Sequence, residues 1–263
     1  MAIRLKLKKD DLDQLTLRFA MTPITKPVFL NSVPKSGTHL LLNIVRTFVA
    51  PGQQYKVDAI QHATLGQHLR AFAQDDPLLS WGHLFFSDNA AVLLRDVNHI
   101  VLVRDPYDWV LARTRFFLSD QFQGNLNNIK GGAAGLEEVM NMMIFGVLHK
   151  APTLSEIYNF NGVAWMGTAA HVLRYEDIIV NLKQIDTPAA ETFFHDLVVN
   201  KVGVSVWPSD WRERIAMGSD RKNSATAREH LDHGMVVPDE LPNTQKRLVD
   251  YHAPGLRRLL GYE

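Results

Sequence analysis

Four apolar runs without regular alternation stand out along the chain. They are rich in valine, isoleucine and leucine, and they cover residues 28–33, 78–85, 99–104 and 171–176. Apolar residues at successive positions favour strands that are covered on both faces, as in a parallel sheet. Between these runs apolar positions recur every three or four residues, which predicts helices over 38–49, 64–73, 89–96, 107–118, 136–149 and 189–202.

The alternation of strands and helices along the chain predicts βαβ units. We therefore expect an α/β fold of three layers, with a mostly parallel central sheet and helices on both faces. A closing helix is expected over 244–262, interrupted at Pro254 and Gly255. No linker rich in proline, glycine or serine divides the chain, so residues 1–263 are predicted to form a single domain.

Two segments lack a clear period. Residues 119–135 contain four glycines and three asparagines, which is typical of a mobile surface loop or lid. Residues 204–237 hold arginines and histidines in no regular pattern, and we interpret them as a loop region that contacts a cofactor or substrate.

Composition removes several classes of function. Lysine plus arginine equals aspartate plus glutamate, 28 of each, and this balance argues against general nucleic-acid binding. Cysteine is absent, which excludes disulfides, thiol nucleophiles and cysteine-based metal sites. The start of the sequence mixes charges and does not look like a secretory signal, and no apolar run approaches the roughly 18 residues of a membrane span. A cytoplasmic protein without a membrane partner is the expectation.

The stretch NSVPKSGTHLLLNIVRTF predicts an anion-binding turn between a strand and a helix. Backbone N–H groups at such a turn, together with the positive end of the helix dipole, attract anions. Gly37 permits a positive φ angle, and Lys35 adds a full positive charge. The residues we expect to bind phosphate are Lys35, Ser36, Gly37, Thr38 and His39.

The ordinary nucleoside-triphosphate loop, G-x-x-x-x-G-K-[ST], fits this stretch poorly. Its two glycines would fall on Phe29 and Pro34. A lysine on a surface turn without a ligand is the plain alternative.

Two further residues lie at the ends of predicted strands, where open α/β sheets bind ligands. Arg104, in HIVLVRDPYDW, carries a guanidinium suited to a phosphate, although a structural pair with Asp105 or Asp108 is the alternative. His83, in SWGHLFF, precedes it by 21 residues and has a side chain suited to general-base catalysis. A buried structural histidine is the alternative there.

Together P-K-S-G-T, the intervening histidine and R-D-P-x-D resemble the sulfotransferases that use 3′-phosphoadenosine 5′-phosphosulfate (PAPS), of the bacterial and cytosolic type. Their fold is related to that of the P-loop kinases, and the resemblance spans roughly residues 26–263. It implies sulfuryl transfer to a hydroxyl or amine of a small-molecule acceptor, with adenosine 3′,5′-bisphosphate (PAP) as product and no metal requirement. It also implies that Lys35 stabilises the leaving group, that His83 is the general base and that Arg104 binds the 3′-phosphate.

The chain departs from the family pattern at several positions. Ala112 stands where a serine usually shares the 3′-phosphate, and Leu40 stands where a tryptophan stacks on adenine. In SATAREHLDHG, Ser224, Thr226 and Arg228 match the family's S-x-T-x-R-K-G, whereas the next two residues do not. Arg228 is therefore the expected second ligand of the 3′-phosphate, with Arg221 and Lys222 as the alternative.

Two other functions remain to be weighed: a P-loop-type kinase or nucleotide hydrolase, and a nucleotide-binding module without catalysis. A metal cluster around His230 and His233 lacks a third group of suitable spacing. Aromatic residues near the predicted site indicate an apolar or aromatic acceptor, although such residues usually form core; they are Trp81, Phe85, Phe86, Trp109, Phe116 and Phe117. The oligomeric state is open.

Overall fold

The computed structural model describes residues 4–5, 10–56, 59–119, 122–123, 129, 132–223 and 236–263. The chain divides into two compact units. Unit 2 comprises Lys9–Val103 and Phe160–Ser224, and unit 1 comprises Met1–Lys8, Arg104–Asn159 and Ala225–Glu263. The prediction of one domain over the whole chain stays a prediction.

Unit 2 is built on a five-stranded sheet. The strands are β2 (Val28–Ser32), β3 (Ile60–Gln61), β4 (Leu79–His83), β5 (Asn98–Val103) and β7 (His171–Arg174), in the spatial order β3-β4-β2-β5-β7. Every pair is parallel, and Leu30 of β2 lies opposite Trp81 of β4 and Ile100 of β5. The predicted parallel sheet is therefore confirmed, with β2 at its centre.

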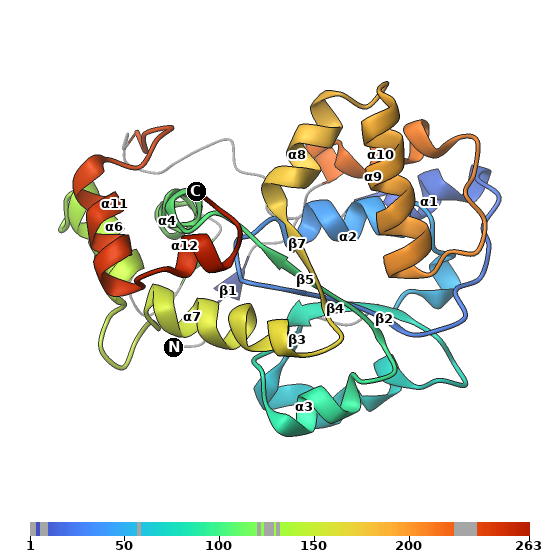
Figure 1. Cartoon of the computed structure of the whole chain (residues 1–263), viewed down its shortest axis with the longest axis horizontal. Coiled ribbons are helices and arrows are strands. Elements are labelled where there is room, and N and C mark those ends of the chain that lie inside the picture. Colours follow the sequence, from blue (N-terminus) through green and yellow to red (C-terminus); the bar gives the residue numbers. More distant parts are fainter. Residues whose placement is uncertain are drawn as a thin grey trace. The chain divides into compact units, whose positions relative to one another are not determined.

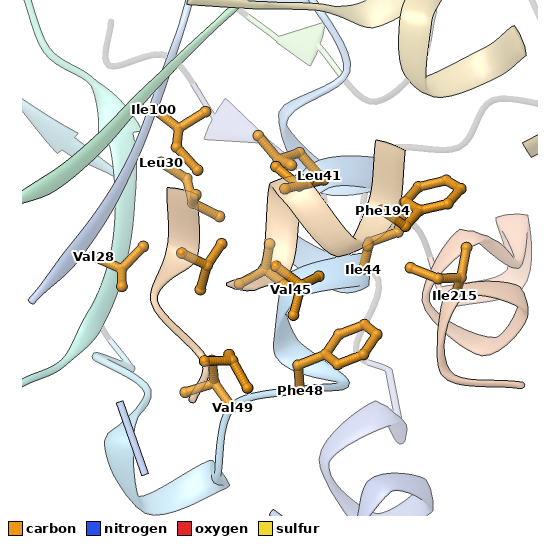
Figure 2. Packing of buried hydrophobic residues seen from close by; sticks show 14 of the residues in the cluster. Val28, Leu30, Leu41, Ile44, Val45, Phe48, Val49, Ile100, Phe194 and Ile215 are labelled. Atoms are coloured by element: carbon orange, nitrogen blue, oxygen red, sulfur yellow. The ribbon is translucent and has the colours of Figure 1, made fainter. Parts of the chain in front are cut away.

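Helices cover both faces of this sheet (Figure 1). On one face lie α2 (Thr38–Arg46), α8 (Tyr175–Lys183), α9 (Pro188–His195) and α10 (Trp211–Ser219), and α3 (Asp88–Leu93) lies on the opposite face. Figure 2 shows how Val28 and Leu30 of β2 face Leu41 and Val45 of α2 in the main core. The intervening Phe29 points the other way and packs its ring 5.4 Å from that of Phe72. Burial on both faces explains why the strands read as mainly apolar runs without alternation.

Unit 1 is mainly helical. It contains α4 (Pro106–Leu118), α6 (Leu136–Phe145), most of α7 (Leu154–Asn161), α11 (Asn243–His252) and α12 (Leu256–Leu259). A two-stranded antiparallel ribbon joins β1 (Arg4–Leu5) to β6 (Phe122–Gln123). Trp109 of α4 is fully buried, and its ring centroid lies 5.4 Å from that of Tyr158.

Shorter elements complete the described chain. They are α1 (Leu12–Leu15), η1 (Thr16–Arg18), η2 (Pro51–Gln53), η3 (His62–Gln67), η4 (Leu69–Phe72), η5 (Val163–Gly167), η6 (Asp196–Val202) and η7 (Arg221–Asn223).

Most predicted elements are present, although several differ in type or extent. The helix predicted over 64–73 is a pair of 3-10 helices, η3 and η4. The strand predicted over 171–176 ends at Arg174, because Glu176 and Asp177 supply the acidic first turn of α8. The closing helix is interrupted as predicted, since α11 and α12 are divided at Gly255, whose φ is 76°.

The two segments without a period are only partly described. Within 119–135, residues 120–121, 124–128 and 130–131 lie outside the described residues. Within 204–237, α10 is a regular helix that the sequence pattern did not predict, and residues 224–235 lie outside the description.

Candidate functional site

The turn between β2 and α2 has an unusual backbone. Lys35 has a φ of 72° and Gly37 a φ of 100°, both in the left-handed region. The N–H of Ser36 donates to the Val33 carbonyl at 3.1 Å, which closes the turn. A Cβ atom added to Gly37 would lie 2.4 Å from a ring carbon of Tyr175, so both the φ angle and the available space require glycine there.

Ser36 is the most informative polar residue of this turn. Its side chain is fully buried, and its Oγ has no hydrogen-bond partner among the described residues. A buried hydroxyl without a partner costs about 1–3 kcal/mol. Such an atom beside a lysine and the first turn of a nine-residue helix fits the oxygen of a bound anion.

The hydroxyl of Ser32, the last residue of β2, connects the turn to His83. Ser32 Oγ lies 2.7 Å from Thr38 Oγ1, at the start of α2. It also lies 3.0 Å from Nδ1 of His83, at the end of β4. One buried hydroxyl therefore links the first residue of the helix to the candidate base.

The hydrogen bonds of His83 determine which nitrogen carries the proton. Nδ1 also lies 3.2 Å from the backbone carbonyl oxygen of Ser32. Because a carbonyl oxygen only accepts, Nδ1 is the protonated nitrogen, and Nε2 of the neutral ring keeps its lone pair. Burial, with a smaller contribution from the positive charge of Lys35, lowers the pKa of His83 to about 4, against the opposing effect of the bond to Ser32. The ring is therefore neutral at pH 7.

The backbone after His83 is held by side chains from other elements. Asn31 of β2 donates to the Leu84 carbonyl at 3.1 Å and accepts from the Leu84 N–H at 2.8 Å. The indole N–H of Trp165 donates to the same carbonyl at 3.2 Å. These bonds fix the end of β4 and hence the position of the His83 ring.

The Trp81 ring lies beside both His83 and His39. The Trp81 centroid is 6.1 Å from that of His83 and 5.1 Å from that of His39. Leu40, which stands at the position of the family's adenine-stacking tryptophan, instead packs against the main core. The loop residues and His83 are thus brought together within unit 2.

Arg104 belongs to unit 1 and directly follows β5 in the chain. Its carbonyl accepts a hydrogen bond from the buried Tyr158 at 2.8 Å. The neighbouring Asp105 accepts from the N–H of Tyr107 at 2.9 Å and caps α4. Its carboxylate also pairs with Arg257, at 2.8 Å.

The remaining candidates for the 3′-phosphate site are less informative. Arg228 lies outside the described residues, as do Ser224 and Thr226. Lys222 pairs with Asp220 at 2.8 Å in unit 2. Beside Ala112, Arg113 donates to the carbonyls of Met143 and Pro152, and Thr114 is fully buried. The Thr114 hydroxyl, like that of Ser36, has no hydrogen-bond partner among the described residues.

The sequence pattern did not identify Ser32, Asn31 or Tyr175 as site residues. The pair Asn31-Ser32 is polar within an otherwise apolar strand, and this is the signal that was available. Tyr175 carried no comparable signal, because its contact with Gly37 depends on the position of α8.

Within the described part of the chain, no group of three histidine or acidic side chains is arranged to hold a metal ion. None of the described helices is long and apolar enough to cross a membrane.

Sequence comparison finds no matching family model and no matching curated protein. Comparison of structures finds a mouse sulfotransferase, SULT7A1, whose crystal structure is a complex with PAP. The two share 14% sequence identity with a TM-score of 0.54, over 94% of this chain and 87% of the mouse chain. At this identity the likeness concerns the fold, and the chain has a sulfotransferase fold, as the sequence motifs predicted.

Proposed function

We propose that the protein is a sulfotransferase that transfers the sulfuryl group of PAPS to a hydroxyl or amine of a small-molecule acceptor. The observation that carries this proposal is the Ser32 bridge, because it joins an anion-binding turn to a neutral histidine. Ser32 Oγ contacts both Thr38, at 2.7 Å, and His83, at 3.0 Å. A simple phosphate loop has no need of a base at that position.

The residues of the turn are suited to hold the 5′-phosphosulfate. Ser36 supplies a buried hydroxyl without a partner among the described residues, and Gly37 permits the left-handed backbone of the turn. Thr38 and His39 begin α2, whose dipole favours an anion. Arg104 and Arg228 remain the proposed ligands of the 3′-phosphate, by resemblance and by the chemistry of the guanidinium group.

PAPS supplies the sulfuryl group. Transfer breaks the bond between its sulfur and the 5′-phosphate oxygen, which releases PAP, and forms a new bond from the sulfur to the acceptor oxygen or nitrogen. His83 Nε2 takes the proton that the acceptor loses. Lys35 stabilises the negative charge that grows on the phosphate oxygen as the bond breaks, an interaction stronger in the transition state than before it. A sulfuryl group carries less negative charge than a phosphoryl group, so we propose that no metal is required.

An apolar or aromatic acceptor is favoured by two exposed rings that contact each other, one of them two residues after the base. Phe85, two residues after His83, is 38% exposed, and Phe160 is 49% exposed. Their centroids are 5.8 Å apart. Both rings expose apolar surface that an aromatic acceptor would cover.

Thermal shift tests the donor. We expect PAP to stabilise the protein, by about 2.7 kcal/mol at a concentration of 100 times its Kd. ATP with Mg²⁺ is expected to have a much smaller effect. Preference for ATP would instead support a P-loop-type kinase.

A transfer assay with labelled PAPS tests the reaction, with a panel of phenols, aliphatic alcohols and amines as acceptors. The catalytically inactive control is His83→Ala, for which we expect at least about a 10²-fold loss. PAP binding without transfer to any acceptor would support the non-catalytic nucleotide-binding module.

A further inference from the structure

The N-terminus of α4 is held by a charged network that reaches it from the C-terminal part of the chain. Arg257 of α12 donates through Nε and Nη2 to the two carboxylate oxygens of Asp105, at 3.0 and 2.8 Å. Its guanidinium also lies over the Tyr107 ring, 4.0 Å from the centroid. The Tyr107 hydroxyl in turn donates to Asp250 of α11, at 2.7 Å. All of these residues belong to unit 1.

The turn between α11 and α12 makes this network possible. Gly255 has a φ of 76°, which lets the chain turn sharply after Pro254. Asp250 before the turn and Arg257 after it then both reach α4. The side chains of Arg257 and Asp105 are 22% and 15% exposed, so their pairing is only partly screened by water.

The Asp105–Arg257 pair lies next to Arg104 in the chain. Asp105 immediately follows Arg104, which we propose to bind the 3′-phosphate, and its carboxylate caps α4 by accepting from the Tyr107 N–H. A carboxylate next to a phosphate site repels the ligand unless a cation compensates its charge. The Arg104 backbone is anchored as well, since its carbonyl accepts from Tyr158.

We propose that Arg257 is a positioning residue for the donor: it neutralises Asp105 while keeping it as the cap of α4, so that Arg104 binds the 3′-phosphate without competition from a neighbouring negative charge. This inference rests on the proposed function. It predicts a specific effect on the 3′-phosphate rather than a general loss of binding.

The test compares the Kd of PAP with that of adenosine 5′-monophosphate, which lacks the 3′-phosphate, by calorimetry at fixed salt. In Arg257→Gln we expect the preference for PAP to fall about tenfold, equivalent to about 1.4 kcal/mol, with the Kd of the monophosphate unchanged. Arg258→Gln is the matched control, because Arg258 is the exposed neighbour on the same helix. It should keep the wild-type preference.

A double variant separates charge from packing. Asparagine at position 105 still caps the helix but carries no charge. In Asp105→Asn/Arg257→Gln the preference for PAP should therefore return to within about twofold of wild type. An unchanged preference in folded Arg257→Gln, or a double variant as weak as Arg257→Gln, would overturn the inference. If the wild-type protein itself does not prefer PAP, the proposed function fails instead.

Discussion

Replacing Ser32 with alanine tests the link between the anion-binding turn and His83 most directly. The Ser32 hydroxyl is fully buried and contacts Thr38 Oγ1 and His83 Nδ1. Each hydrogen bond contributes about 0.5–1.5 kcal/mol net, and the buried Thr38 hydroxyl loses a partner. We therefore expect Ser32→Ala to lower the free energy of unfolding by about 2 kcal/mol.

The same change should weaken catalysis without abolishing it. His83 keeps its contact with the Ser32 backbone carbonyl, 3.2 Å away, so its tautomer is preserved while one of its two anchors is lost. We expect kcat/KM to fall about tenfold, or about 1.4 kcal/mol in the barrier, against at least about 10²-fold for His83→Ala.

Ser80→Ala is the matched control. Ser80 is also fully buried, and its hydroxyl donates to the Val28 carbonyl at 3.2 Å. It lies three residues before His83 in β4, and its side chain points to the opposite face of the sheet. It should lose about 1 kcal/mol of stability with kcat/KM unchanged.

Urea unfolding followed by circular dichroism measures the stability of both variants, and PAP release from PAPS in the presence of a working acceptor measures kcat/KM. If Ser32→Ala is as active as Ser80→Ala, the bridge has no catalytic role and the main support for the proposed function is removed.

Three other expectations follow from the same geometry. Lys35→Ala should reduce transfer at least about 10²-fold. In an NMR titration of this variant the pKa of His83 should rise above about 4 but stay below 6.5, because burial remains. An unchanged pKa would contradict the contribution of Lys35. The pKa values of His83 and His99 are lowered to about 4 and about 3, so the unfolded chain binds more protons below pH 6.5, and the free energy of unfolding should decrease as the pH falls from 6.5 towards 4. His99→Phe should make this decrease shallower in urea titrations at several pH values, and an unaltered pH dependence would rule out His99 as a source. Gly37→Ala should lower the free energy of unfolding by about 1–3 kcal/mol in thermal or urea experiments. Gly52→Ala should be nearly neutral, because an added Cβ there meets nothing within 4 Å. Equal effects would refute the argument from the φ angle and the available space.

The strands and the turn between β2 and α2 could be predicted from the sequence because their signals are local. Residues 28–33 read as a mainly apolar run without alternation, since both faces of β2 are covered. Lys35 and Gly37 stand in a short motif whose backbone conformation follows from a strand-to-helix turn. By contrast, β3 has only two residues, too few for any period, and it exists because Gln61 pairs with His83 of β4.

The contacts that organise the site could not be predicted, because they join residues far apart in the chain. Ser32 and His83 are separated by 51 positions, and their contact depends on the parallel register of β2 with β4. Asp105 and Arg257 are separated by 152 positions and meet only because the chain turns at Gly255. A motif identifies which residue types are available, but the sheet register and the helix packing decide which of them meet.

The low pKa of His83 connects donor binding at the turn with the strength of the base. A histidine with a pKa of about 4 is a weak base at neutral pH, since proton transfer is most effective when the pKa is near the working pH. One cause of the low pKa is the charge of Lys35, and an anion bound beside Lys35 offsets that charge. On the proposed function, donor binding therefore raises the pKa of His83 and makes it a stronger base. The acceptor is then deprotonated more readily when the donor is in place, although burial continues to hold the pKa of His83 below 6.5.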